Sequence, residues 1–199
     1  MVLVASKEAC SPARVGTIEG TPLSTIIDSK FKTKPYRHQF ECLTKFGRRD
    51  IFALLAEQGT GKTWILINNM AILWASKDCD GVLIFAPNGV HMNWTVFEFP
   101  QHMPDWCRYK AAAWSADPNR KEKALLANLH ANAGSGELRV LTMNWEGLAH
   151  KRAFQYAEKF AGSCRRLMII CDESDAVKNP SAHRTKALFK LKKYSHWRR

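Results

Sequence analysis

The most informative segment of the chain reads Ala56-Glu57-Gln58-Gly59-Thr60-Gly61-Lys62-Thr63. It follows an apolar run with strand character, residues 51–56, and opens a helix predicted over residues 61–76. Gly59 and Gly61 lack Cβ atoms, so the backbone N–H groups of this turn can curl around an anion at the start of the helix. The segment therefore predicts a phosphate-binding loop of the P-loop type, with alanine in place of the usual first glycine.

Each residue type in this loop has a task in that prediction. Lys62 would reach the β- and γ-phosphates of a nucleotide, and the Thr63 hydroxyl would bind Mg²⁺. A glycine turn before an ordinary helix is the alternative, and the preceding strand and following helix argue against it. The predicted nucleotide-binding residues of the loop are Gln58, Gly59, Thr60, Gly61, Lys62 and Thr63.

A second segment, residues 166–173, is an apolar run that ends in two carboxylates, Asp172 and Glu173. In a parallel sheet, ligands bind at the carboxyl ends of the strands. Asp172 is therefore predicted to lie near the Mg²⁺ held by Thr63, and Glu173 to orient and deprotonate an attacking water. A solvated strand end is the alternative, and the P-loop upstream favours the catalytic interpretation.

Strand and helix patterns alternate along the rest of the chain. Strands are predicted at residues 51–56, 82–86, 109–113, 138–143 and 167–171, and helices at residues 37–46, 61–76, 89–99, 119–132, 151–161 and 181–191. This alternation predicts an α/β fold with a parallel sheet covered by helices on both faces. Residues 1–34 are interpreted as a lead-in segment with a short element near residues 23–27, and residues 35–199 as the domain itself.

Charge narrows the class of partner. Thirty Lys and Arg against 18 Asp and Glu give a net charge of +12, which favours a polyanion, usually nucleic acid, over a merely basic surface. Uninterrupted apolar runs are far shorter than the roughly 20 residues of a membrane span, so no membrane partner is predicted. The first residues lack the pattern of a secretory signal, which predicts a cytoplasmic protein.

Several motifs together resemble a known family. Asp172-Glu173-Ser174-Asp175 resembles the DExD/H motif of superfamily-two helicases and translocases. The Lys178-Asn179-Pro180 that follows is typical of the Swi/Snf-type group of DNA-dependent ATPases. Upstream, residues 35–39 resemble the segment whose glutamine, here Gln39, reads adenine. Residues 86–98 resemble motif Ia, a DNA-backbone contact region that here includes Trp94 and Glu98, and residues 142–146 resemble the next DNA-side motif.

The resemblance implies a fold, a reaction and partners. The fold would be the N-terminal RecA-like domain of a P-loop NTPase, with ATP and Mg²⁺ as cofactors. The partner would be double-stranded DNA bound without sequence preference, and ATP hydrolysis would drive movement on it in the cytoplasm of a bacterium or of a phage host. The residues that the resemblance places against DNA are Pro87, Asn88, Asn93 and Asn144.

The chain also departs from the family. The fourth position of the acidic motif is Asp175, where remodeller-like members usually carry histidine. The family continues beyond the position of Arg199 with a strand and motif III, and then with a second RecA-like domain. The resemblance therefore predicts a domain truncated before the motif III strand, so that the P-loop strand and the acidic strand lack their shared neighbour. Such a fragment would hydrolyse ATP at a trace rate.

Two other function classes remain open. One is a P-loop ATPase or kinase that ignores nucleic acid, against which the basic charge and Lys178-Asn179-Pro180 argue. The other is a non-catalytic module that only binds nucleotide or DNA. Salt-dependent DNA binding separates the motor from the first alternative, and ATP turnover separates it from the second.

Overall fold

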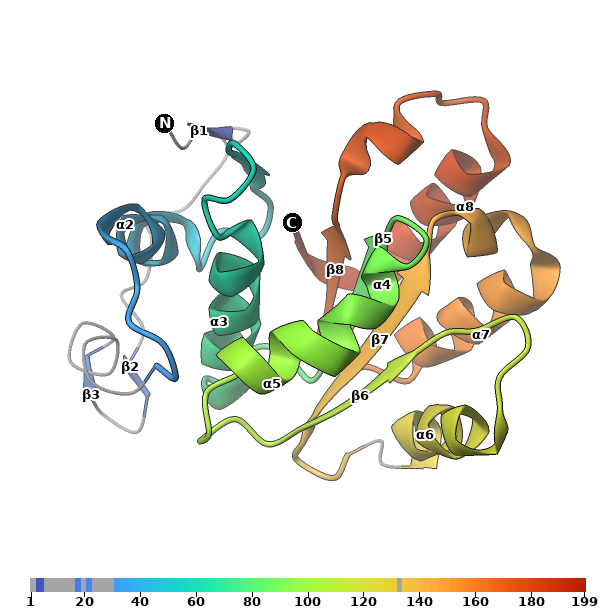
Figure 1. Ribbon diagram of the computed structural model, residues 1–199, viewed down its shortest axis with the longest axis horizontal. Helices are drawn as coiled ribbons and strands as arrows, with labels where there is room; N and C mark the ends of the chain where they lie inside the picture. The colour runs from blue at the N-terminus through green and yellow to red at the C-terminus, as the bar shows by residue number, and fades with distance from the viewer. Residues whose placement is uncertain (1–2, 6–16, 19–20, 23–30, 132–133) are drawn as a thin grey trace.

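A parallel sheet forms the centre of the computed structural model, which describes residues 3–5, 17–18, 21–22, 31–131 and 134–199 (Figure 1). Within these residues, five strands pair in the order β6-β7-β5-β8-β9. Their bounds are Gly81–Ala86 for β5, Tyr109–Ala113 for β6, Leu138–Asn144 for β7, Leu167–Cys171 for β8 and Ser195–Arg198 for β9. All four pairings are parallel, which is the arrangement that the alternation of strands and helices predicts.

Alternate side chains of the central strands enter two separate apolar cores. Val82 and Ile84 of β5 pack in one core, whereas Leu83 and Phe85 pack in the other. Every residue of β5 is buried, as expected for a central strand covered on both faces. The helices of the two faces close these two cores.

Helices lie on both faces of the sheet, in agreement with the predicted α/β class (Figure 1). One face is covered by α3 (Lys62–Ala75), α4 (Val90–Asn93), the π-helix η1 (Trp94–Glu98) and α5 (Phe99–His102). The other face is covered by α6 (Arg120–Ala131), α7 (Lys151–Gly162) and α8 (His183–Leu191). In the described part of the chain, no helix combines the length and apolar character needed to cross a bilayer.

Shorter elements complete the chain. Helix α2 (Arg37–Phe46) packs on α3, away from the sheet. The 3₁₀ turns are η2 (Glu146–Ala149), η3 (Ser174–Val177) and η4 (Lys192–Tyr194). In the lead-in segment, β2 (Thr17–Ile18) pairs with β3 (Thr21–Pro22). The short element predicted near residues 23–27 lies outside the described residues.

One predicted helix is wrong in its detail. The sequence predicted a single helix over residues 89–99, whereas the structure has α4, a π turn and α5 in succession. Pro100 gives a physical reason, because proline has no N–H to donate to the carbonyl of Val96 and its ring disfavours that α-helical turn. Instead, the N–H of Phe99 donates to the carbonyl of Trp94, five residues back. The predicted helix over residues 181–191 also begins later, at His183.

The strand before the P-loop departs from the prediction as well. It is shorter than residues 51–56, because β4 spans Ala53–Leu55 and pairs antiparallel with β1 (Leu3–Ala5). Just before it, Ile51 forms a parallel bridge with Arg198 of β9. The segment around Ile51 runs parallel to β9, and Ile51 stands opposite Arg198, the last residue of β9. The residues of β4 therefore extend beyond the end of β9, and their backbone pairs with β1 instead.

The gap expected between the strand before the glycine loop and the acidic strand is absent, so the prediction that these two segments lack a shared neighbour is wrong. Strand β9 fills this position, pairing with β8 on one side and with Ile51 on the other. Backbone bonds on both sides are short, with Cys171 N to Arg199 O at 2.9 Å and Arg198 N to Asp50 O at 2.8 Å. The basic residues around it concealed this strand in the sequence, although Trp197 in its middle is buried.

The side chain of Arg199 stabilises the junction between β9 and the segment around Ile51. Its guanidinium donates to the carbonyls of Gly47 at 3.1 Å and Arg49 at 2.8 Å, and to Asn69 Oδ1 of α3 at 2.8 Å. It also lies over the ring of Phe52, 4.2 Å from the centroid. One side chain thus ties the segment that leads into the P-loop to the helix that follows it.

We predict that Arg199→Ala lowers the free energy of unfolding by roughly 2 to 4 kcal/mol, because carbonyl groups that are partly shielded from water lose their donor. Urea denaturation of parent and variant measures this difference. Arg108→Ala, which removes an exposed guanidinium, is the matched control and should change stability by less than about 0.5 kcal/mol. Equal losses of stability in the two variants would contradict the stabilising role of Arg199.

Candidate nucleotide-binding site

The loop between β4 and α3 has the backbone of an anion-binding turn. Gly59 and Gly61 both have positive φ, +77° and +76°, a conformation that side chains with a Cβ rarely adopt. Gly61 is the residue before α3, so the free N–H groups of a 14-residue helix begin at the loop. The hydroxyl of Thr60 donates to the carbonyl of Glu57 at 2.8 Å and closes the turn.

Lys62 lies folded against this turn. Its ammonium group donates to the carbonyls of Ala56 at 2.9 Å and Glu57 at 3.2 Å. Both bonds hold the charge beside the loop, where an anion bound to the backbone N–H groups would meet it. Thr63 follows in the first turn of α3 and is half-buried, whereas Gln58 is exposed.

Helix α2 supports the loop from outside. Gln39 is 3% exposed, and its amide donates to the carbonyl of Thr60 at 3.3 Å while accepting from the N–H of Tyr36 at 2.9 Å. The ring of His38 also bonds the Thr60 carbonyl, at 2.9 Å. Both ends of the Gln39 amide are therefore engaged with backbone, and the contact with adenine that the sequence resemblance implies stays a prediction.

A pocket of about 650 Å³ opens beside the loop. Its walls come from residues 33–36 and Gln39, from Gly61, Thr63 and Trp64 at the start of α3, and from Glu98 and His102 at the end of η1 and α5. The side chains of this last wall are linked, because His102 lies 3.7 Å from Glu98 and 3.3 Å from the hydroxyl of Thr33. The Trp64 indole N–H donates to the same Thr33 hydroxyl at 2.7 Å, so aromatic and polar groups meet in this wall of the pocket.

Asp172 stands at the end of β8, where the sequence predicts it. Its N–H donates to the carbonyl of Phe85 at 2.8 Å, which continues the pairing of β8 with β5 beyond the last strand residue. Burial raises the pKa of its carboxyl above the ordinary value, and the charge of Glu173 adds to this rise. The hydrogen bond from Trp94 and the charge of Lys62 lower the pKa.

Two buried tryptophans hold Asp172. The indole Nε1 of Trp94 donates to its carboxylate at 3.2 Å, and the indole Nε1 of Trp145 donates to its carbonyl at 3.0 Å. Both rings are buried, and each is 1% exposed. Nothing in the sequence indicated their bonds to Asp172, since Trp94 and Asp172 are 78 residues apart.

Glu173 does not belong to the buried group formed by Asp172, Trp94 and Trp145. It is exposed and has a φ of +50°, an unusual backbone conformation for a residue with a side chain. Such conformations cost about 1–3 kcal/mol and concentrate at functional sites. The next acidic residue, Asp175, forms an exposed ion pair with Lys178 at 3.0 Å.

The residues predicted to contact DNA gather at the same edge of the sheet as Asp172. Pro87 and Asn88 follow β5, and Asn144 ends β7, where it stands opposite Ala86 in the pairing. Asn88 and Asn93 are exposed, whereas Asn144 is half-buried and donates to Glu146 at 3.2 Å. These residues therefore lie at the same carboxyl-terminal edge of the sheet as Asp172, and their contact with DNA stays a prediction.

Some side chains of the site escaped the sequence analysis. Glu98 was grouped with a DNA-side motif, but the structure has it in the wall of the pocket beside the P-loop. His102 and Trp64 also line the pocket. Pro100, which breaks the helical periodicity, is the sequence feature that could have indicated an irregular helix near residues 94–102. His38, which the sequence analysis did not single out, bonds to the loop.

The donor groups suit Mg²⁺. Magnesium in nucleotide sites binds one or two protein oxygens together with phosphates and waters. The Thr63 hydroxyl and the Asp172 carboxylate are oxygen donors of this kind, on the two sequence segments that the P-loop prediction names. Among the described residues, no group of three or more His, Cys, Asp or Glu side chains forms a cage for a metal ion.

Comparison with known proteins adds no assignment. No protein-family model matches the chain, and a search of curated proteins finds no match. The description of the site therefore depends on its own geometry.

We predict that Gly61→Ala destabilises the loop more than Gly59→Ala does. Both positions have positive φ, so each alanine costs about 1–2 kcal/mol of backbone strain. A Cβ on Gly61 would also overlap the amide nitrogen of Gln39, whereas nothing lies within 4 Å of a Cβ on Gly59. Denaturant unfolding should show at least about 1 kcal/mol more loss for Gly61→Ala. Equal losses would mean that Gln39 moves aside freely.

Proposed function

We propose that the chain is the N-terminal RecA-like, ATP-binding domain of a superfamily-two, Swi/Snf-type DNA-dependent ATPase, which in the full motor couples ATP hydrolysis to movement on duplex DNA. One observation carries the proposal. The Lys62 ammonium is held against a glycine turn at the start of α3, and a single strand, β9, separates the segment before this turn from β8, which Asp172 follows. A phosphate-binding lysine and a strand-end aspartate in this relation are what an NTP-hydrolysing site requires.

The roles of the residues follow from their chemistry. Lys62 and the N–H groups of the loop would bind the phosphates, and Gln39 keeps the loop in shape through the Thr60 carbonyl. When bound by Thr63 and Asp172, Mg²⁺ would neutralise charge on the phosphates. Glu173, exposed just past Asp172, would orient and deprotonate the attacking water.

The sheet order supports the RecA-like assignment. In that arrangement one strand separates the P-loop strand from the acidic strand, and β9 has this position between Ile51 and β8. The order of the motifs along the chain agrees with the same family. The alternatives, a P-loop enzyme that ignores nucleic acid or a module without turnover, correspond to different outcomes of the tests below.

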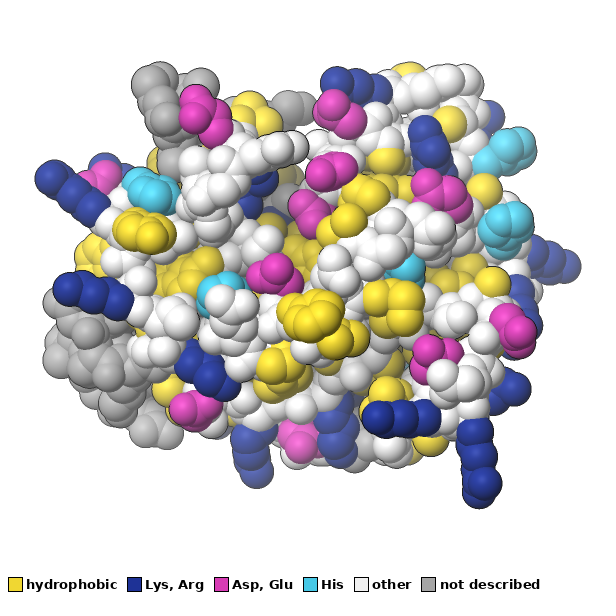
Figure 2. Space-filling model, in the orientation of Figure 1, with side chains coloured by type: hydrophobic (Ala, Val, Ile, Leu, Met, Phe, Trp, Pro, Cys, Tyr) yellow, Lys and Arg dark blue, Asp and Glu magenta, His cyan; other side chains and the backbone are white. Residues whose placement is uncertain are grey.

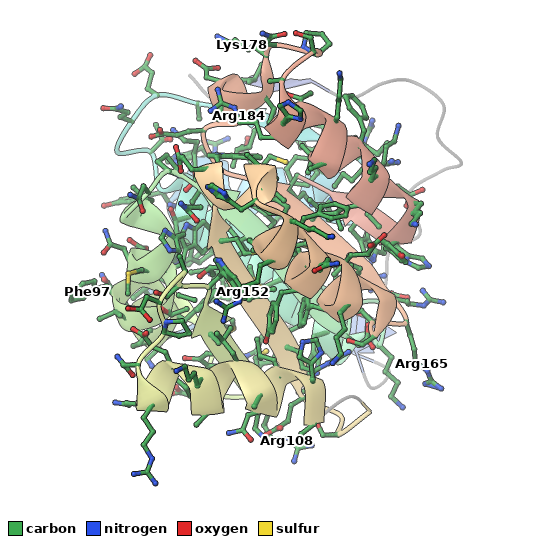
Figure 3. The ribbon with its side chains drawn as sticks, turned by 90° about the vertical axis from the view of Figure 1, so that its right-hand side faces the viewer. Phe97, Arg108, Arg152, Arg165, Lys178 and Arg184 are labelled. Carbon is green, nitrogen blue, oxygen red and sulfur yellow. The ribbon has the colours of Figure 1, made fainter. Side chains whose placement is uncertain are left out.

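The net charge of +12 supports a polyanionic, nucleic-acid partner. Lys and Arg lie mainly around the rim of the face in Figure 2, where apolar side chains gather over α4 and α5. Figure 3 shows the face formed by α6, α7 and α8, across which Arg152, Lys178 and Arg184 are spread. Arg152 and Lys178 are exposed and follow the carboxyl ends of β7 and β8 along the chain. The DNA phosphates would meet these side chains at the edge that carries Asn88 and Asn144.

For the ATP site, we expect Lys62→Ala to weaken the binding of a fluorescent ATP analogue about 10- to 100-fold, because a charge-assisted contact with phosphate is lost. Glu173→Gln should keep the binding but lower the slow phosphate release by at least about 100-fold, because the general base is lost. Lys45→Ala, which removes an exposed lysine of α2, is the matched control. Equal affinity of Lys62→Ala and parent would refute the nucleotide site, and binding without any turnover would favour a non-catalytic module.

For DNA, we expect duplex binding whose logarithmic affinity falls linearly with logarithmic salt concentration, without sequence preference. The double variant Arg152→Ala/Lys178→Ala should lower the slope by about 1 to 2, because each phosphate contact releases counterions. Fluorescence anisotropy over a salt series measures the slope.

Arg165→Ala provides the control for that measurement. Arg165 is exposed on the same face but precedes β8, at the opposite edge of the sheet from Lys178 (Figure 3). Its loss should leave the slope unchanged. Binding that does not depend on salt, or no binding at all, would favour a P-loop enzyme that does not act on nucleic acid.

A further inference from the structure

Trp94 donates its indole N–H directly to the carboxylate predicted to hold Mg²⁺. The distance from Nε1 to Asp172 Oδ2 is 3.2 Å, and the ring is 1% exposed. A carboxylate offers about four acceptor positions, so this donor leaves room for a cation.

The ring of Trp94 is held in one orientation. It packs against Phe99 with ring centroids 5.8 Å apart and an angle of 59° between the planes. The π turn creates this pair, because residues five apart lie on different sides of an α-helix but approach the same side in a π-helix. On the outer side of the same turn, Phe97 projects into solvent and is 62% exposed (Figure 3).

Trp145 gives a useful contrast on the other side of Asp172. It stacks on Phe85 with centroids 5.3 Å apart, and its N–H bonds the backbone carbonyl rather than the carboxylate. Trp145 therefore fixes where the end of β8 lies, whereas Trp94 fixes how the carboxylate is turned. These two functions can be separated by mutation.

We propose that Trp94 is a positioning residue for the divalent cation, which orients the Asp172 carboxylate so that it binds Mg²⁺ together with the nucleotide. This inference rests on the proposed function of the site. Partners that bond to a metal-binding carboxylate typically contribute 10- to 100-fold to metal affinity. The π turn is the device that presents Trp94 to Asp172, and local π-helices occur frequently at functional sites.

The test measures how much Mg²⁺ strengthens nucleotide binding, as the ratio of dissociation constants of a fluorescent ATP analogue without and with Mg²⁺. Trp94→Phe keeps the aromatic ring and removes the N–H. We expect the ratio to fall about 10-fold or more, whereas the affinity without Mg²⁺ stays within about twofold. A merely structural role of the ring would lower both affinities together.

Trp197→Phe is the matched control. Trp197 belongs to the same apolar core, and its N–H bonds a backbone carbonyl, that of Asp78, at 2.7 Å. This variant loses an indole hydrogen bond as well, but it should leave the Mg²⁺ ratio unchanged. Trp145→Phe should destabilise the fold and reduce the ratio less than Trp94→Phe does.

The outcomes are distinguishable. A parent chain that does not bind the ATP analogue overturns the proposed function, and the inference with it. If the parent binds the analogue and Trp94→Phe has the same Mg²⁺ ratio as the parent, the inference is overturned while the proposed function stands. Should Trp94→Phe fail to fold in a thermal melt, Phe99→Leu loosens the Trp94 ring and retains its N–H. A lowered Mg²⁺ ratio in that variant supports the inference, and an unchanged ratio overturns it.

Discussion

The backbone pairing of β9 with β8 on one side and with Ile51 on the other is the constraint on which the site depends. Strand β4 itself pairs with β1, so Ile51 is where the segment before the P-loop meets the large sheet. Hydrogen bonds across β9 therefore fix the distance between the loop and the end of β8. Lys62 follows the segment on one side of β9 and Asp172 follows β8 on the other side, so this pairing sets how the two residues lie relative to each other.

Side-chain hydrogen bonds of Arg199 and Asn69 add to the backbone pairing of β9. The Asn69 amide donates to the carbonyl of Gly47 at 2.8 Å, and its oxygen accepts from Arg199 at 2.8 Å. Asn69 is buried in the middle of α3, where it and Asn68 are the polar residues among apolar neighbours. A buried amide that satisfies both of its ends fixes one orientation of α3 against the segment before the loop, because any rotation would leave polar groups without partners.

The π turn at Trp94 joins two parts of the site that are distant in the sequence. Its first residue bonds Asp172, and its last, Glu98, borders the pocket beside the P-loop. The altered helical spacing, which Pro100 favours, lets Phe99 pack beside Trp94 in the core. One short segment thus contacts both the acidic strand end and the pocket wall, and it covers the sheet between them.

The sequence by itself determined most of the elements and the glycine turn before α3. Glycine spacing and apolar runs depend on neighbouring residues, so this turn, the strands at residues 109–113 and 167–171 and the buried helix α3 could be predicted from local pattern. Only the tertiary structure decided which strand lies between the glycine loop and β8, since β9 is short, is flanked by basic residues and takes its place by pairing with distant backbone. The bond from Trp94 to Asp172 and the wall formed by Glu98 also needed the fold, because hydrogen bonds between segments tens of residues apart leave no periodic signal in the chain.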